Sequence, residues 1–491
     1  MSDPKKTIQS NSCLIKKKKM DQLDKLSNLP TGVTHQILSY LPIKQAVRTS
    51  ILSSDWRYKW AQLPCLVFDD RTHRSGYPIA KVVDHVLLLH SGRIDTFKLS
   101  TFNYPAARDI DKWISHLSRS NVKVFVLKVW ELLPRYNVFS CFFSFKDLTH
   151  LELCNCLLKP PTTFKGFRML KSLHLQEVIV SGHVLGKLIA CCPQLERIIL
   201  CDLKGITDVT IDAPSIRFLR VRGSFEDVLL ANTLNLVDVS IDWKQVSTIS
   251  SSKLLRYFFE LPRIERLTLK DGFLEYAVGS LTKNLLPTPC LCLKFLSIRI
   301  CLNNLDEIST AIHLMRSAPA LQELDILVRK GEETNDGKAT YCLIDKQNWE
   351  FTQLQRMKVT GFSGVKAEVD FIEFLLLTSP GLQELEISFC QDVKKVDFSW
   401  LDDNQKTCAF TQLLVVKVTG FSGVRAEVDF IRFLLSSTSK VILQPASVKV
   451  YWDVFKLLPV FRRDSLHADL KLLGPSIHVQ DSDDSSFCLR L

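Results

Sequence analysis

The chain lacks several features that would place it in other classes of protein. Its 491 residues contain no uninterrupted apolar run of about 18 residues, the length that a membrane-spanning helix needs. The first 20 residues offer only "CLI" where a secretory signal peptide carries roughly 7–15 apolar residues. We therefore expect an intracellular protein without membrane segments, located in the nucleus, the cytoplasm or both.

Signatures of catalysis and of metal binding are also missing. No phosphate-binding loop, dinucleotide-binding fingerprint or nucleophile elbow occurs, and the two "GFSG" elements have the wrong spacing for each of them. His85, His116 and His313 stand singly in helical patterns, where a structural histidine is the default interpretation. We therefore predict a protein that is not an enzyme, has no catalytic residues and needs neither a metal nor another cofactor.

Charge and cysteine content favour an ordinary folded protein. The net charge is +11, but residues 1–20 hold six Lys and one Asp and contribute +5, so the other residues carry only +6. Lys16–Lys19 fit a nuclear import patch, a polyanion contact or a solvated tail, and we expect residues 1–22 to be disordered. The 15 cysteines fall inside hydrophobic runs, which indicates buried free thiols.

Apolar residues first gather in the stretch from Leu26 to Trp60. Prolines and apolar spacing predict three short helices, which carry Val33, Ile37, Leu38 and Leu41 after Pro30, then Ile43, Ala46, Val47 and Ile51, then Trp56 and Trp60 after Ser53 and Ser54. About 40 residues cannot bury the surface that such helices expose. The segment therefore needs another protein or the remainder of the chain to pack against.

The spacing L-x-x-L-x-L recurs thirteen times between residues 90 and 420. The units begin at Ile94, Val124, Leu148, Leu170, Leu195, Ile216, Leu236, Ile264, Leu293, Leu321, Leu354, Leu382 and Leu413, so they start 20 to 33 residues apart. Leucine-rich repeats have a period of roughly 20–29 residues. We therefore predict a solenoid in which each unit adds one parallel strand to a concave sheet.

A second kind of repetition lies near the C-terminus. Residues 351–380 and 410–439 align without gaps and are identical at 21 of 30 positions. This identity exceeds what repeat packing demands and indicates a tandem duplication. Each copy predicts a strand, a "GFSG" turn and a helix; the helices carry Val369, Ile372, Phe374 and Leu375, or Val428, Ile431, Phe433 and Leu434.

The text "LSNLP-x2-V-x3-IL-x2-LPIKQAVRTSILS-x2-WRYKW-x2-LP-x-LVFDD" resembles an F-box, in the form found in plant F-box proteins with leucine-rich repeats and an FBD region. The duplicated unit and residues 447–470 resemble the FBD region, of which one copy is usual. By this resemblance the helices dock on the Skp-type adaptor of a cullin-RING ubiquitin ligase. The residues that match the docking face are Leu29, Pro30, Ile37, Leu38, Leu41, Pro42, Ile43, Ala46 and Val47.

The resulting expectation is an α/β chain in five parts. Residues 1–22 form a basic tail, 23–68 a three-helix F-box, 90–345 the leucine-rich-repeat solenoid, 346–470 an FBD region that caps it, and 471–491 a frayed acidic tail. The resemblance implies the substrate-recognition subunit of a Skp-cullin-F-box (SCF) ligase. Such a subunit holds a target protein near the ubiquitin carrier and supplies proximity instead of chemistry.

Polar residues that flank the inner leucines on the predicted strands form the candidate surface for the target. We single out His150, Glu152, His174, Arg220, Arg222, Arg266, Lys270, Arg299, Glu323 and Asp325, a mixed and modestly basic set. Two other functions stay open: a leucine-rich interaction scaffold without a ligase, and a nucleic-acid binder that uses the basic tail with Arg217, Arg220 and Arg222. The mild charge of the body disfavours the latter.

Overall fold

The computed structural model describes most of the repeats and part of the N- and C-terminal regions. The described residues are 29–69, 78–102, 105–130, 135–225, 227–245, 257–258, 261–271, 273–274, 289–330, 350–390, 413–422, 425–435, 438–447, 450–452 and 469–474. They fall into two compact units: the first ends at Ile216 and includes Leu230–Asn232, and the second holds Arg217–Leu229 and the chain from Thr233. Of the helices described, none has the length and hydropathy that a membrane crossing requires.

Two α-helices, α2 (Thr31–Ser39) and α3 (Ile43–Arg48), come first in the described part of the first unit. Pro30 and Pro42 each occupy the position directly before a helix. A proline fits at a helix start because its fixed φ suits the first turn and its missing N–H would have no partner there. Two 3-10 helices follow, η1 (Thr49–Ile51) and η2 (Lys59–Gln62).

The prediction of a third α-helix after Ser53 and Ser54 is wrong. The chain forms turns over residues 54–58 and then η2, and the N–H groups of Trp56 and Ala61 donate to the carbonyl groups three residues earlier, at 3.2 and 3.0 Å. Trp56 and Trp60 are both 3% exposed, so burial of two large rings decides the local path. Tight three-residue hydrogen bonds and the weak helix propensity of tryptophan are consistent with this outcome.

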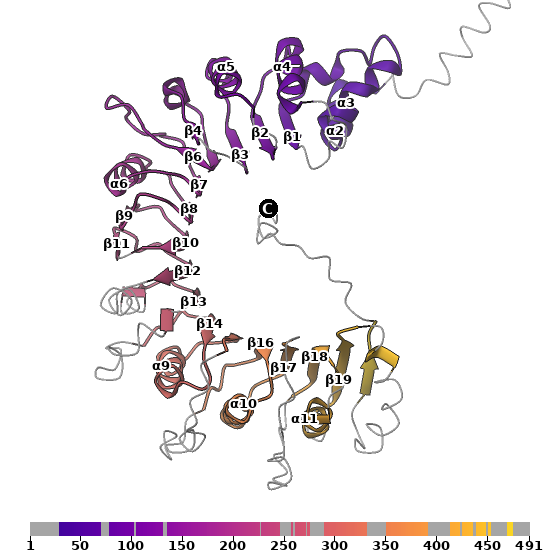
Figure 1. Cartoon of the computed structure of the whole chain (residues 1–491), viewed down its shortest axis with the longest axis vertical. Helices are drawn as coiled ribbons and strands as arrows, with labels where there is room; N and C mark the ends of the chain where they lie inside the picture. Colours follow the sequence, from indigo (N-terminus) through magenta and orange to yellow (C-terminus); the bar gives the residue numbers. More distant parts are fainter. Residues whose placement is uncertain are drawn as a thin grey trace, which may run out of the picture. The chain divides into compact units, whose positions relative to one another are not determined.

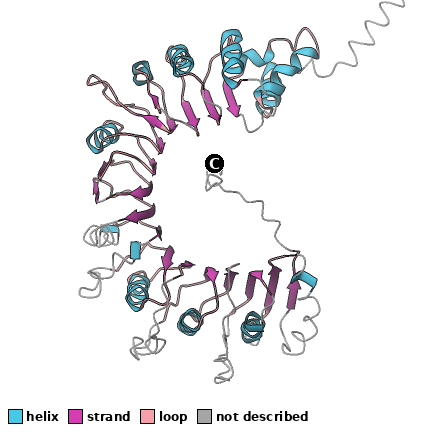
Figure 2. Ribbon diagram, in the orientation of Figure 1, coloured by secondary structure: helices cyan, strands magenta, loops and turns pink. Residues whose placement is uncertain are grey.

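A parallel sheet forms the main layer of the first unit (Figure 1). Its strands, in spatial order, are β1 (Cys65–Asp69), β2 (Thr96–Thr101), β3 (Val124–Val129), β5 (His150–Cys154), β7 (Ser172–Gln176) and β8 (Arg197–Cys201). Outside this sheet lie α4 (Ile79–Leu89), α5 (Ala107–Leu117), β4 (Tyr136–Asn137), η4 (Ser140–Ser144), β6 (Cys156–Leu157), α6 (Gly182–Ala190) and β9 (Asp208–Asp212). The helices lie on one side of the strands (Figure 2).

The second unit repeats this arrangement. Its parallel strands, in spatial order, are β10 (Phe218–Ser224), β12 (Asp238–Gln245), β13 (Arg266–Asp271), β14 (Phe295–Ile300), β15 (Glu323–Val328), β16 (Arg356–Phe362), β17 (Glu384–Phe389), β18 (Val415–Phe421), β19 (Lys440–Pro445) and β20 (Asp469–Leu472). The helices α9 (Leu305–Arg316), α10 (Lys366–Thr378) and α11 (Arg425–Leu435) lie on one side (Figure 2). The strand β11 (Asp227–Ala231) is divided between the two units.

All thirteen strands predicted from the repeat spacing are present: β2, β3, β5, β7, β8, β10 and β12 to β18. Equivalent leucine positions pair in register across neighbouring strands, as in Leu324–Met357–Leu385–Val416–Val441, and all five side chains are buried. Inner positions therefore form continuous apolar rows, which is why each repeat depends on its neighbours. Within the described residues, β1, β19 and β20 extend the sheets beyond the prediction.

The duplicated unit forms the predicted strand, turn and helix in both copies. The strands β16 and β18 and the helices α10 and α11 begin 59 residues apart, as the sequence copies do. Each strand runs through the "GF" of "GFSG", with a register shift at Gly361 or Gly420. These glycines have φ of 81° and 72°, and a Cβ would lie 2.9 Å from the carbonyl oxygen of the preceding strand, so glycine is required there.

A buried glutamate near the start of each of these two helices accepts hydrogen bonds from the turn before it. The carboxylate of Glu368 accepts from the N–H and hydroxyl of Ser363 at 2.7 and 2.8 Å, and Glu427 accepts from Ser422 at the same two distances. Both side chains are at most 5% exposed. Each carboxylate therefore fastens its helix to the end of the preceding strand.

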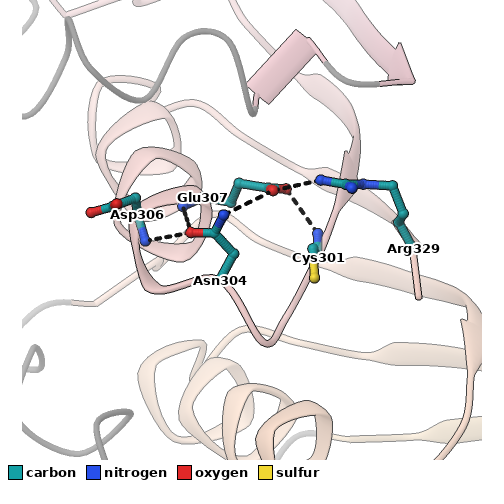
Figure 3. A network of polar contacts seen from close by, with 5 residues as sticks. All are labelled: Cys301, Asn304, Asp306, Glu307 and Arg329. Atoms are coloured by element: carbon teal, nitrogen blue, oxygen red, sulfur yellow. Dashed lines mark hydrogen bonds and ion pairs between the residues drawn. The ribbon is translucent and has the colours of Figure 1, made fainter. Parts of the chain in front are cut away.

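Glu307 of α9 makes a related contact with an added cation (Figure 3). Its carboxylate accepts from the backbone N–H of Cys301 at 2.9 Å and from Nη2 of Arg329 at 2.6 Å. Asn304 precedes the helix and accepts from the N–H groups of Asp306 and Glu307 while donating to the Glu307 carboxylate. Because Glu307 is 1% exposed and Arg329 follows β15, this network joins α9 to the ends of two strands.

The N-terminal helices are fastened to the first repeat by close backbone contacts. Gly92 donates its N–H to the carbonyl of Ala61 at 3.1 Å, and a Cβ on Gly92 would lie 2.7 Å from the Cα of Gln62. The side chain of His90 contacts the carbonyl of Leu63 at 2.9 Å, and β1 pairs with β2 over five residues. The segment that resembles an F-box and the first repeats therefore form one packed body within the first unit.

Several predictions concern residues outside the described ranges. These are the tail 1–22 with Lys16–Lys19, the start of the predicted F-box, most of 447–470 and the segment 475–491, and of Phe433 only the backbone is described. The predicted tail of 471–491 begins too early, because β20 pairs with β19 through Leu472. Alternating apolar residues allow "DLKL" to continue the sheet.

Candidate functional site

Several large apolar side chains are exposed on the N-terminal helices and on the turns that follow them. Val33, Ile37 and Tyr40 follow one side of α2 at helical spacing, and Ile51, Leu52 and Tyr58 lie in the turns after α3. Their exposed fractions are 42%, 39%, 79%, 87%, 57% and 64% in that order. We call these six residues, with the exposed Pro30 and Pro42, the N-terminal apolar surface. Grouped apolar exposure of this kind is typical of protein interaction sites.

The structure divides the nine residues predicted to contact an adaptor. Pro30, Ile37 and Pro42 are exposed, and Leu29, Leu41 and Val47 are half-buried. Leu38, Ile43 and Ala46 are at most 5% exposed and pack inside the segment. In this structure they support the surface from beneath and are not available for direct contact.

Contacts inside the segment explain this division. The side of α2 that carries Thr34 and Leu38 is buried, and α2 and α3 both pack against η2, which holds the buried Trp60. Neighbouring residues such as Ile37 and Leu38 therefore point to opposite surroundings. The helical period shows that two apolar sides exist, whereas only the position of η2 shows which one is covered.

Five exposed residues of this surface are absent from the sequence-based list of contacts: Val33, Tyr40, Ile51, Leu52 and Tyr58. A signal for the first two was present, because Val33 and Tyr40 share the helical side of Ile37. The other three follow α3, where the sequence predicted further helix and the structure has 3-10 helix and turns. Their exposure depends on this local path.

Three of the predicted target-binding residues meet on the sheet face of the first unit. Glu152 of β5 lies between Lys128 of β3, at 2.8 Å, and His174 of β7, at 2.6 Å. Burial alone would raise the pKa of Glu152, but the hydrogen bond and charge of His174 and the Lys128 ammonium lower it to about 2. Burial lowers the pKa of the neighbouring His150.

Charges on the sheet face of the second unit alternate in sign from strand to strand. Arg222 faces Asp242 at 3.7 Å, and Asp242 is also in register with Lys270. Arg266 approaches Asp238 at 3.8 Å and stacks 3.8 Å above the ring of Phe295. Opposite charges at neighbouring positions attract across a sheet, so these cations belong to mixed rows.

The same alternation continues toward the C-terminal strands. Glu323 pairs with Arg356, and Glu386 lies between Lys358, at 3.7 Å, and Lys417, at 3.4 Å. Asp325 accepts from the hydroxyl of Ser297 at 3.1 Å. The charged residues singled out from the sequence lie on this face, but the sequence did not predict their ion pairs, which neutralise much of the expected basic character.

Arg220 and Arg299 complete the predicted set. Both are half-buried, and Arg220 lies 5.8 Å above the ring of Phe218 on the same strand. The ten residues therefore do not meet at one point. They occupy strands of both units, and the contacts described above join them only to their neighbours.

Burial suppresses the reactivity of several described cysteines. Burial raises the pKa of Cys154 to about 12 and that of Cys192 to about 11, and it raises the pKa of Cys156 further. A thiol reacts as the thiolate, so these cysteines are inert near neutral pH. In the described ranges, no group of three His, Cys, Asp or Glu side chains is placed to hold a metal ion.

Parallel repeats joined to N-terminal helices with an exposed apolar surface define a class: a leucine-rich-repeat protein that begins with an F-box. The F-box domain family matches residues 26–68, and the leucine-rich repeats of the FBD-associated F-box protein At5g56370 match residues 110–326. The chain belongs to the F-box/FBD/LRR-repeat family.

Relatives from Arabidopsis thaliana support this membership. The F-box/FBD/LRR-repeat protein At1g13570 is 34% identical over 381 residues, which cover 74% of this chain and 91% of the relative. The F-box/FBD/LRR-repeat protein At5g56420 is 32% identical over 239 residues, 45% of this chain and 55% of the relative. The F-box/LRR-repeat protein At3g26922 is 26% identical over 285 residues, 51% of this chain and 91% of the relative.

Proposed function

We propose that the chain is the substrate-recognition subunit of an SCF ubiquitin ligase in the nucleus, the cytoplasm or both. The observation that carries this proposal is the N-terminal apolar surface, because it lies on the segment that matches the F-box domain. An F-box domain generally binds a Skp-type adaptor, so the exposed side chains have a partner of the right kind. The chain itself acts as a non-catalytic subunit.

The proposed adaptor contact uses the exposed and half-buried part of the surface. It includes Ile37 and Tyr40 at α2 and Ile51, Leu52 and Tyr58 in the turns after α3, all of which are exposed. Burying several large side chains of this kind supplies most of the binding free energy in a typical interface. Leu38, Ile43 and Ala46 hold the helices in place beneath it.

The close joint at Gly92 supports the proposed mechanism. A ligase subunit raises the local concentration of its target near the ubiquitin carrier, and this effect is strongest when the connection has few accessible conformations. Here β1, which follows the N-terminal helices, pairs with β2 of the first repeats. A target held by the first unit would therefore keep a fixed position relative to the adaptor.

The sheet faces are the proposed surface for the target protein. Many of their charges are already paired, so a target gains little from a single opposite charge and must match the alternating rows. This favours a target whose own charges alternate in the complementary order. Examples of contact positions are Glu152 and His174 in the first unit and Glu323 and Asp325 in the second.

The test is the affinity of the full chain for a recombinant plant Skp-type adaptor, measured by isothermal titration calorimetry. Ile37→Asp with Tyr40→Asp places two charges on the proposed contact. Leu88→Asp with Leu89→Asp is the matched control, because these side chains of α4 are 80% and 41% exposed, against 79% and 39% for Tyr40 and Ile37. Far-UV circular dichroism confirms that both variants are folded.

We expect micromolar or tighter binding that weakens by more than about 30-fold in the first variant and by less than about threefold in the control. A folded parent that does not bind the adaptor would refute the ligase function. The remaining candidate would then be an interaction scaffold whose apolar surface serves another partner.

A further inference from the structure

A groove outside the main sheet of the first unit combines aromatic walls with positive charge. It opens between η4 and the following residues on one side and the loop of residues 161–168 on the other, and its volume is about 620 Å³. The helix η4 packs beside α5, outside the row of paired strands. The groove is therefore separate from the sheet face and from the N-terminal apolar surface.

Two half-exposed rings line this groove. Phe143 and Phe164 meet edge to face with their centroids 5.1 Å apart. Both rings rest on Phe167, which is 2% exposed, at 6.5 and 4.9 Å. Because the buried ring fixes the two outer rings, they offer a preformed apolar contact that needs little ordering when a ligand binds.

All the charged side chains that line the groove are cationic: Lys146, Lys165 and Arg168. All three are exposed. Among the described residues, none of the three has an ion-pair partner. This arrangement differs from the sheet face, where Lys128, Arg266 and Lys358 each approach a carboxylate. The three cations of the groove are therefore not held in ion pairs with other described side chains.

The backbone of the loop is constrained at Gly166. Gly166 has φ of 91°, and a Cβ there would lie 2.0 Å from the carbonyl oxygen of Cys191. Any other residue would clash with this backbone, so the loop is held against the chain after α6. The backbone that carries Lys165 and Arg168 is therefore anchored next to the aromatic rings, while both cationic side chains stay exposed.

We propose that this aromatic-cationic groove binds an acidic peptide segment of a target protein in which a large apolar side chain is flanked by carboxylates. The apolar side chain packs against Phe143 and Phe164. The carboxylates pair with Lys146, Lys165 and Arg168. This inference rests on the proposed function, since it supplies a second contact for the target outside the sheet face.

The exposure of the cations decides between a peptide and a simple anion. Each exposed ion pair contributes little, about 0–1 kcal/mol, so one carboxylate or phosphate alone would bind weakly. Several carboxylates on a segment that is also anchored by an apolar side chain add these contributions and bury the rings. A peptide meets both conditions, and inorganic phosphate meets neither.

The probe is a fluorescein-labelled peptide Asp-Glu-Phe-Asp-Glu, and its binding to the full chain is followed by fluorescence anisotropy. Lys165→Glu with Arg168→Glu reverses two charges of the groove. Lys112→Glu with Lys187→Glu, on exposed positions of α5 and α6, changes the net charge by the same amount elsewhere in the first unit. A second probe carries alanine in place of phenylalanine, and inorganic phosphate serves as competitor.

We expect the groove variant to weaken binding at least tenfold, the control variant to weaken it less than threefold, and the alanine probe to bind at least tenfold more weakly. Phosphate at 10-fold excess over the peptide should not displace it. No binding of the probe at 1 mM chain, or equal loss in both variants, would overturn the proposal. Adaptor affinity measured on the same variants separates this failure from failure of the ligase function, because the groove residues lie outside the adaptor contact.

Discussion

Loss of the Glu307 carboxylate should destabilise the second unit more than any exposed acid on the same helix. Glu307→Ala removes the acceptor of the Cys301 N–H and of the Arg329 guanidinium (Figure 3). Breaking a buried ion pair by removing one partner costs about 3–5 kcal/mol, and because Arg329 is 27% exposed we expect the lower end, about 3 kcal/mol. Glu307→Gln keeps one acceptor oxygen and should cost about 1–2 kcal/mol.

The assay is urea unfolding together with hydrogen exchange of the peptide that covers residues 305–316. Asp306→Ala is the control, because this exposed acid of the same first turn contributes only its interaction with the helix dipole, about 0.3–1 kcal/mol. Faster exchange in α9 and a lower urea midpoint are expected for Glu307→Ala. Equal effects of the two alanine variants would refute the assigned role of the buried carboxylate.

Three further changes test other parts of the structure. Gly92→Ala forces the backbones of the first repeat and η2 apart and should cost about 1–3 kcal/mol, whereas Gly32→Ala, with open space in α2, should be neutral or stabilising; thermal unfolding compares them. Glu152→Gln should cost about 3 kcal/mol at pH 7, because His174 and Lys128 hold the folded pKa of Glu152 near 2, below its ordinary value of 4.5. In urea unfolding this loss of stability should shrink as the pH falls from 4.5 toward 2. Glu368→Ala and Glu427→Ala should lower the urea midpoint by similar amounts, because their contacts with the preceding serines match; a silent copy would contradict this equivalence.

The repeat strands were predictable because their buried positions recur within the sequence. Leu324, Leu385 and Val416 occupy one row of the sheet, and each stands in the same place in L-x-x-L-x-L. The strand β1 has the same alternation in "CLVFD" but adjoins the helical segment, and its pairing with β2 depends on contacts that local spacing does not contain. The periodicity therefore predicted the repeat strands better than it predicted where the sheet begins and ends.

The candidate site was less predictable because accessibility depends on tertiary contacts. Ile37 and Leu38 are equally apolar and adjacent, yet only Leu38 is covered by the chain that carries Trp60. In the same way, the sequence does not predict the ion pair between Arg266 of β13 and Asp238 of β12. Residue type was visible in the sequence, while partners were not.

We propose that the N-terminal helices connect this chain to a cullin through a Skp-type adaptor. The most direct measurement is size-exclusion chromatography with multi-angle light scattering, after the full chain has been mixed with purified adaptor and cullin. We expect one species whose mass equals one copy of each protein. The variant Ile37→Asp with Tyr40→Asp should give separate peaks for the chain and for the adaptor–cullin complex. A folded parent chain that elutes alone at micromolar concentration would contradict it.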